Sequence, residues 1–190
     1  MDAMDDEDLA LAADYRDNGN PGAIDRLVSK YGRSLLGYLR AATRNPHDAE
    51  EVFQDTWLKA MRKIAYFKGG SFKAWLTTIA RNCVIDRTRK MRPEASLDRE
   101  LDEEGTRVVD LMEDVSAPKP EAGMVSAERA ARIREAVAAL PDAQREVFLL
   151  RVEQDVPFAE IASMLGIPLN TALGRMHYAV TRLRKELEGI

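Results

Sequence analysis

An acidic segment rich in proline and glycine divides this chain into two parts. Between Pro93 and Glu128 it carries eleven acidic and three basic residues, three prolines and two glycines, and its apolar residues follow no sustained helical period. A segment of this composition buries too little apolar surface to offset the entropy lost on folding. We therefore predict a linker at 95–125, with one domain at 1–94 before it and a second at 126–190 after it.

Both flanking parts have the apolar periodicity of helices. Apolar residues recur there at intervals of three and four, runs typical of strands are scarce, and 45% of the 190 residues are hydrophobic, which suffices for two small cores. The predicted fold class is all-α: two small helical domains joined by an acidic flexible linker, the C-terminal one containing a helix-turn-helix. No apolar run is long enough to cross a membrane and the first residues are acidic, so we expect a cytoplasmic protein without membrane insertion.

Few residues in the chain suit metal, redox or catalytic chemistry. Cys83 is the only cysteine and there are two histidines, so we expect no internal disulfide, no metal site and no cofactor. Cys83 falls in an apolar stripe and is expected to be a core residue. Asp86 lies on the apolar side of its helix and is expected to pair with a nearby arginine, because no second titratable group suited to acid catalysis is indicated. The chain is therefore not expected to be an enzyme.

Charge is strongly segregated along the chain, although the net charge is only -4. From Lys59 to Arg92 there are ten basic residues and one acid, directly before the acidic linker. A block of this kind is a candidate for binding a polyanion.

The helix expected after Asn45 and Pro46, running to about Phe67, has two different faces. Its predicted inward stripe consists of Phe53, Trp57, Ala60 and Ile64. The opposite side then carries Glu51, Asp55, Leu58 and Arg62. Two interpretations remain open, namely a solvated charged face with one stray leucine and a docking face for a basic partner helix.

A loop at Lys68–Ser71 precedes a further helix, which Ser71 is expected to cap. The predicted buried stripe of this helix is Phe72, Trp75, Leu76, Ile79 and Cys83, and the outer stripe is Thr78, Asn82, Ile85, Arg89 and Arg92, with Arg81 beside it. Cations for phosphates, glycines for close approach and Phe72 for stacking together favour single-stranded DNA binding. The alternative is a basic face that is merely solvated.

The second domain contains a helix-turn-helix pattern at Phe158–Thr171. Ala162 is small where two helices cross, and Gly166 suits the tight turn between them. A final helix then runs to Glu188 with a predicted inward stripe of Ala172, Met176, Val180, Leu183 and Leu187. Its outer face is expected to hold Gly174, Tyr178, Thr181 and Lys185, flanked by Arg175, His177 and Arg182. We interpret this helix as a DNA recognition helix, although some helix pairs of this geometry only pack.

Three segments in this order resemble the extracytoplasmic-function (ECF, group IV) RNA polymerase sigma factors. The segment 48–57 resembles the core-polymerase-binding segment of that family, 67–82 with Asp86 resembles its promoter-melting segment, and 140–151 resembles the start of its C-terminal domain. The resemblance covers nearly the whole chain apart from the acidic linker, which by analogy threads toward the RNA exit path.

The resemblance implies roles for individual residues. Glu51, Gln54 and Asp55, with Leu58 beside them, would contact the clamp helices of the largest polymerase subunit. The loop from Lys68 through Ser71 to Phe72 would hold a flipped base of the minus-ten element, and Arg81, Asn82, Arg89 and Arg92 would hold the separated strand. In the recognition helix, the DNA-binding residues would be Thr171, Gly174, Arg175, His177, Tyr178 and Arg182.

The start of the recognition helix departs from the family pattern. Members usually carry Gly-Thr-Val-Lys or Arg-Ser-Arg there, whereas this chain has Asn170-Thr171-Ala172-Leu173-Gly174-Arg175. Leu173 and Gly174 replace a basic and a hydroxyl side chain that commonly meet DNA. We therefore predict that recognition of the minus-thirty-five element relies on Arg175, His177, Tyr178 and Arg182, or is weaker than usual.

The function that the sequence favours is a sigma factor, which binds core RNA polymerase through its clamp helices and flap, and recognises and melts promoter DNA. An anti-sigma factor is the further partner that the resemblance implies. One alternative is a sigma-like decoy that sequesters an anti-sigma factor without initiating transcription. Another is a helix-turn-helix regulator that acts without polymerase.

Overall fold

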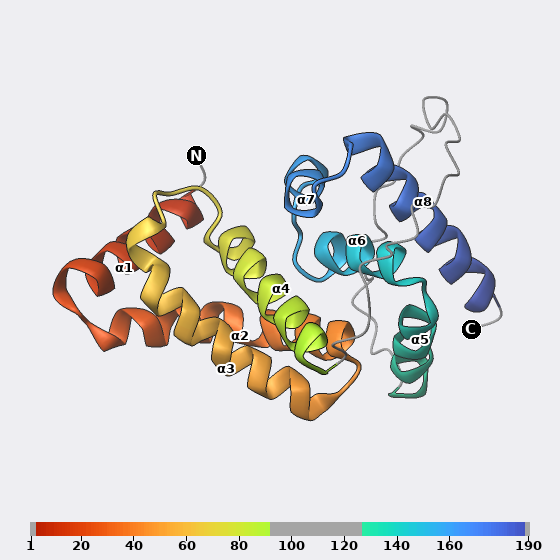
Figure 1. Ribbon diagram of the computed structural model, residues 1–190, viewed down its shortest axis with the longest axis horizontal. Helices are drawn as coiled ribbons and strands as arrows, with labels where there is room; N and C mark the ends of the chain where they lie inside the picture. The colour runs from red at the N-terminus through yellow and green to blue at the C-terminus, as the bar shows by residue number, and fades with distance from the viewer. Residues whose placement is uncertain (1–2, 92–126, 189–190) are drawn as a thin grey trace. The chain divides into compact units, whose positions relative to one another are not determined.

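The computed structural model describes residues 3–91 and 127–188, which fall into two helical units (Figure 1). The units are Met1–Glu94 and Ala95–Ile190. Neither described range contains a strand, so the all-α fold class is confirmed. No helix in these two ranges is both long and apolar enough to cross a membrane. The linker predicted at 95–125 lies wholly outside the described residues, and its limits stay a prediction.

Asparagine caps and prolines set where the helices of the first unit begin. The Asn20 side chain accepts a hydrogen bond from the Gly22 amide at 3.0 Å, and Asn45 Oδ1 accepts one from the His47 amide at 2.9 Å. In each case the next residue is a proline, which suits the first helical position because its missing N–H would have had no partner there. The elements are α1 (Ala3–Asn18), α2 (Pro21–Thr43), α3 (Pro46–Lys63), the 3-10 turn η1 (Ile64–Tyr66) and α4 (Phe72–Met91).

The core of the first unit lies where α2, α3 and α4 pack together. An aromatic cluster occupies the end of this core at which α4 begins. The Phe72 ring lies 5.3 Å from the rings of Phe67 and Trp75 and 5.6 Å from that of Tyr31, measured between centroids. Cys83, on the same side of α4, is 3% exposed, which confirms its expected place in the core.

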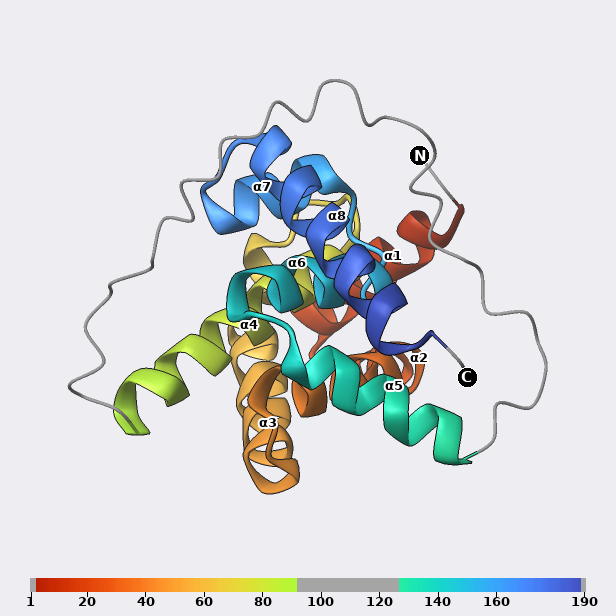
Figure 2. The ribbon, with the colours of Figure 1, turned by 90° about the vertical axis from the view of Figure 1, so that its right-hand side faces the viewer.

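A helix-turn-helix forms in the second unit, where α5, α6 and α7 each pack against α8 (Figure 2). Gly166 ends α7 with φ +65°, a left-handed conformation that favours glycine, and the Ile167 amide donates to the Ala162 carbonyl at 3.0 Å. The tight turn expected at Gly166 is therefore present. The elements are α5 (Ala127–Ala139), α6 (Asp142–Val152), α7 (Phe158–Leu165) and α8 (Leu169–Glu186).

A buried carboxylate holds α1 against α2. Asp8 is 1% exposed, accepts a hydrogen bond from Lys30 Nζ at 2.6 Å, and also accepts one from the Tyr31 hydroxyl. Both donors come from one turn of α2, so a single side chain of α1 satisfies them together.

We predict that Asp8→Ala lowers the free energy of unfolding of this unit by about 2 kcal/mol, because it removes the buried carboxylate that accepts hydrogen bonds from Lys30 and Tyr31. Both tryptophans, Trp57 and Trp75, lie in this unit, so their fluorescence during urea titration follows its unfolding. Asp17→Ala is the matched control, since Asp17 forms only an exposed pair with Arg16 on the same helix and its loss should leave the transition unchanged. Equal midpoints for the two variants would contradict the role given to Asp8.

Candidate nucleic-acid interface

The loop between η1 and α4 presents polar side chains and glycine backbone to solvent. Gly69 and Gly70 have φ values of +110° and +81°, which side chains rarely adopt, and Lys68, Gly70 and Ser71 are exposed. Ser71 Oγ accepts a hydrogen bond from the Ala74 amide at 3.2 Å, so it caps α4 as expected. The loop therefore offers one lysine and bare backbone to a ligand.

Phe72 does not belong to this exposed surface. Its side chain is 1% exposed and packed within the aromatic cluster, so the stacking role expected for it is wrong. The reason is local, because α4 begins at Phe72 and the residue is the first member of the inward stripe of that helix.

Tyr66 is the aromatic residue that sequence reasoning missed. It is 76% exposed at the end of η1, two residues before Lys68, and the exposed cations Arg62 and Lys63 precede it. An exposed ring among cations combines a stacking surface with phosphate attraction. Its position within a basic run was a usable signal, but the adjacent Phe67 left open which of the two rings faces inward.

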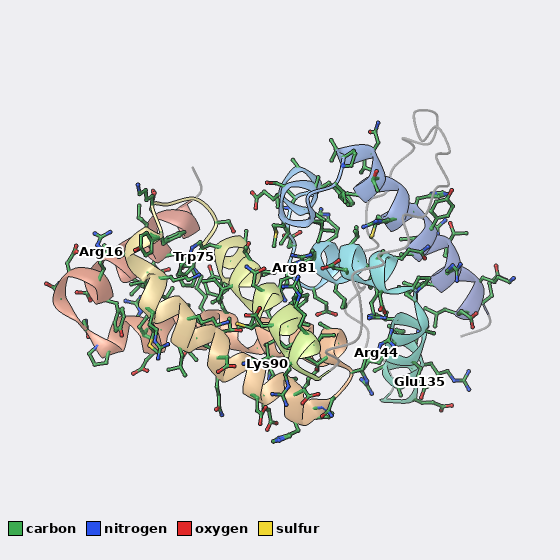
Figure 3. The ribbon with its side chains drawn as sticks, viewed as in Figure 1. Arg16, Arg44, Trp75, Arg81, Lys90 and Glu135 are labelled. Atoms are coloured by element: carbon green, nitrogen blue, oxygen red, sulfur yellow. The ribbon has the colours of Figure 1, made fainter. Side chains whose placement is uncertain are left out.

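The outer face of α4 is only partly as expected. Asn82 and Arg89 are exposed, whereas Thr78, Arg81 and Ile85 are half-buried. Figure 3 shows Trp75, Arg81 and Lys90 following one another along the helix. Arg92 lies outside the described residues. The exposed polar surface of α4 therefore centres on Asn82, Arg89 and Lys90.

Ion pairs between α3 and α4 engage part of the basic block. Arg87 donates from Nε to Asp48 at 3.0 Å and also contacts Glu51. The hydrogen bond to Asp48 raises the pKa of Arg87, and the nearby Glu51 charge adds to the effect. Arg87 is thus held by two carboxylates of its own domain.

Asp86 also forms an ion pair, but its partner differs from the expected one. Its carboxylate accepts from Lys59 Nζ at 3.0 Å, and this hydrogen bond raises the pKa of Lys59. The Asp86 side chain is 53% exposed rather than turned into the apolar side. The pairing role is therefore correct, while the arginine partner and the inward orientation were wrong.

The outward face of α3 combines two exposed polar residues with an exposed leucine. Gln54 and Asp55 are exposed, and Leu58 is 47% exposed. Glu51 is half-buried, and besides Arg87 it lies 3.4 Å from His47 Nε2. Three of the four residues expected in polymerase docking are thus exposed, and the fourth is half-buried and already has partners.

The predicted recognition helix, α8, exposes fewer of the expected side chains than the sequence indicated. Gly174 lies opposite the inward stripe by helical spacing, yet it is buried, so it cannot supply the expected contact. Arg182 is exposed, and the other expected residues are half-buried, namely Thr171, Arg175, His177 and Tyr178. The His177 and Tyr178 rings lie edge to face with centroids 5.7 Å apart.

The first unit has one surface suited to a polyanion and another suited to a protein partner. Cations and Tyr66 surround the loop before α4, while the neighbouring α3 presents a mixed acidic and apolar face. Within the described ranges, no group of three or more histidine, cysteine or acidic residues could hold a metal ion.

Comparison with known proteins identifies each unit separately. Residues 27–93 match the family model of Sigma-70 region 2, and residues 130–183 match that of Sigma-70, region 4. The chain is 31% identical to ECF RNA polymerase sigma factor SigW of Bacillus subtilis, over 90% of this chain and 92% of that protein. It is 30% identical to ECF RNA polymerase sigma factor RpoE of Cereibacter sphaeroides, over 94% of each.

Solved structures share the fold. The sigma factor RpoE of Bartonella quintana, crystallised with the anti-sigma factor NepR, has a TM-score of 0.65 and 25% identity, covering 87% of this chain and 96% of that chain. CnrH in complex with the cytosolic domain of CnrY also has a TM-score of 0.65, with 24% identity over 96% of this chain and 97% of that chain.

Proposed function

Because this chain belongs to the ECF sigma factors of the sigma-70 family, we propose that it binds core RNA polymerase and directs it to promoters, which it recognises and melts. The observation that carries this function is the pairing of two surfaces on adjacent helices. The docking face of α3 and the basic strand-binding face of α4 belong to one packed unit. Polymerase and the separated strand would thus be held by one rigid body.

The proposed polymerase site is the exposed face of α3, formed by Gln54, Asp55 and Leu58, with Glu51 at its edge. A partly exposed leucine framed by polar and acidic residues offers an apolar contact inside a polar rim that attracts a basic helix. The clamp helices of the largest subunit are the proposed partner, and the flap is the proposed partner of the second unit.

The proposed strand site runs from Tyr66 through the Lys68–Ser71 loop to Asn82 and Arg89. Extruding a base costs a few kcal/mol, which stacking and phosphate contacts must offset. Since Phe72 is buried, the exposed ring that can stack on a base here is Tyr66.

An anti-sigma factor is the further proposed partner, acting in the cytoplasm where polymerase works. The Bartonella quintana relative was crystallised with such a protein. Both accessible faces of the first unit would be covered by a partner of that kind, which would explain control without any change in the sigma fold.

The direct test adds the purified protein to core polymerase and looks for specific run-off transcripts from genomic fragments. We expect transcripts that start at discrete positions and require the protein. A folded protein that yields none from any fragment would contradict the proposal and favour a decoy that binds only an anti-sigma factor.

Leu58→Ala should weaken binding to core polymerase by about tenfold, because it removes the apolar centre of the docking face. Leu58 is 47% exposed, so the variant should fold normally. Fluorescence anisotropy of labelled protein titrated with core polymerase measures the affinity. Val152→Ala, at a 43% exposed apolar position in the other unit, is the control. Unchanged affinity for Leu58→Ala would remove this residue from the site.

Tyr66→Ala should slow or weaken promoter opening by about tenfold, because one base loses its stacking partner. A 2-aminopurine placed in the minus-ten element reports the opening. Tyr66→Phe keeps the ring and should behave like the unchanged protein, and neither variant should alter affinity for core polymerase. If alanine opens promoters at the normal rate, stacking by Tyr66 is wrong.

Arg89→Ala should weaken the salt dependence of holoenzyme binding to a forked promoter probe. The slope of log affinity against log salt concentration should become less steep by about 0.7, as expected for one lost phosphate contact on a single strand. Arg87→Ala, two residues away, should change this slope less, since Asp48 and Glu51 already engage Arg87. The same decrease in both variants would show that the internal ion pairs do not withhold Arg87 from DNA.

A further inference from the structure

The first six residues of the recognition helix carry no charge. They read Leu169-Asn170-Thr171-Ala172-Leu173-Gly174, and the first basic residue of α8 is Arg175. The commonest specific contact to guanine is a bidentate one from arginine or lysine. In a helix-turn-helix it is the N-terminal part of the recognition helix that meets base edges. This part of α8 therefore lacks the side chains suited to guanine.

The side chains that are accessible there have a different chemistry. Leu169 is 46% exposed, Asn170 is exposed, and Leu173 is half-buried one turn after Leu169. Ala172 is buried, and the buried Gly174 offers no side chain. The accessible set thus consists of two leucines, one amide and the half-buried hydroxyl of Thr171.

These side chains complement an A·T pair. In the major groove thymine presents its 5-methyl group, which takes apolar contacts, and adenine presents N7 and N6, which pair with an asparagine amide. We propose that the start of α8 reads A·T pairs in the minus-thirty-five element, with Leu173 and Leu169 contacting thymine methyl groups and Asn170 contacting an adenine. This inference rests on the proposed sigma function and names the bases that the function selects.

The surroundings favour DNA over a protein partner at these leucines. From Leu169 to Lys185, α8 carries four basic residues and no acid, and Arg182, Arg184 and Lys185 are exposed. Cations further along the helix can bind the phosphate backbone and orient the helix, while the uncharged first turns contact the bases. A single exposed leucine is ordinary on a protein surface. Two leucines four residues apart, beside an asparagine, form one surface that can contact base edges.

The test removes single methyl groups from the DNA. On a promoter identified by run-off transcription, each thymine of the minus-thirty-five element on either strand is replaced by deoxyuridine, which lacks only the methyl group. Holoenzyme affinity is measured by competition. We expect at least one position at which the loss is about fourfold, the effect of one methyl group leaving an apolar contact.

The variants assign that loss to residues. Leu173→Ala should bind the thymine promoter more weakly and no longer distinguish thymine from deoxyuridine, whereas Val152→Ala on α6 should keep the full difference. Asn170→Ala should likewise become insensitive to 7-deazaadenine at the adenine that it contacts. Both alanine changes raise helix propensity, and because Leu173 is half-buried, the thermal unfolding midpoint of each variant is measured to confirm that it folds.

Two outcomes separate this inference from the function on which it rests. Specific transcripts together with equal affinity for thymine and deoxyuridine at every position would overturn A·T reading by the leucines and leave the sigma function standing. The absence of specific transcripts from every fragment would overturn both.

Discussion

The packing of Phe72 against Phe67, Trp75 and Tyr31 is the interaction on which the first unit depends. It fixes the start of α4 to α2 and to the segment after η1, and so determines the path of the Lys68–Ser71 loop. With the Phe72 ring inside, Tyr66 lies outside at the other end of the same short segment. The packed Phe72 ring thus fixes the segment that carries Tyr66, and the proposed strand-binding surface extends from Tyr66 along α4.

Electrostatics adds a second constraint between α3 and α4. Asp48 and Glu51 of α3 pair with Arg87 of α4, and Lys59 of α3 pairs with Asp86 of α4, so three ion pairs join the two helices. These pairs reduce the repulsion among the cations of the basic block and leave Lys68, Arg89 and Lys90 facing solvent. The helices that carry the proposed docking and strand-binding faces are therefore linked by ion pairs as well as by their shared core.

Local signals in the sequence predicted most of the fold. The Asn45-Pro46 pair predicted a helix start, and Gly166 predicted the tight turn, because each acts within a few residues of itself. Features that depend on how helices pack against one another were harder to predict from the sequence. The lysine partner of Asp86 comes from another helix, and the burial of Gly174 depends on what surrounds it in space rather than on its helical position. Ser71 marked the start of α4 and so the inward position of Phe72, whereas the exposure of Tyr66 depended on which of the adjacent rings, Tyr66 or Phe67, packs inward.

The burial of Cys83 has a practical consequence for labelling. It is the only thiol in the chain, and at 3% exposure it reacts slowly with probes in the folded state. A cysteine introduced at an exposed position can therefore be labelled selectively without removing the native one. Each of the two units can in this way receive a single dye or crosslinker, so that distances within a transcribing complex can be measured on the otherwise unaltered chain.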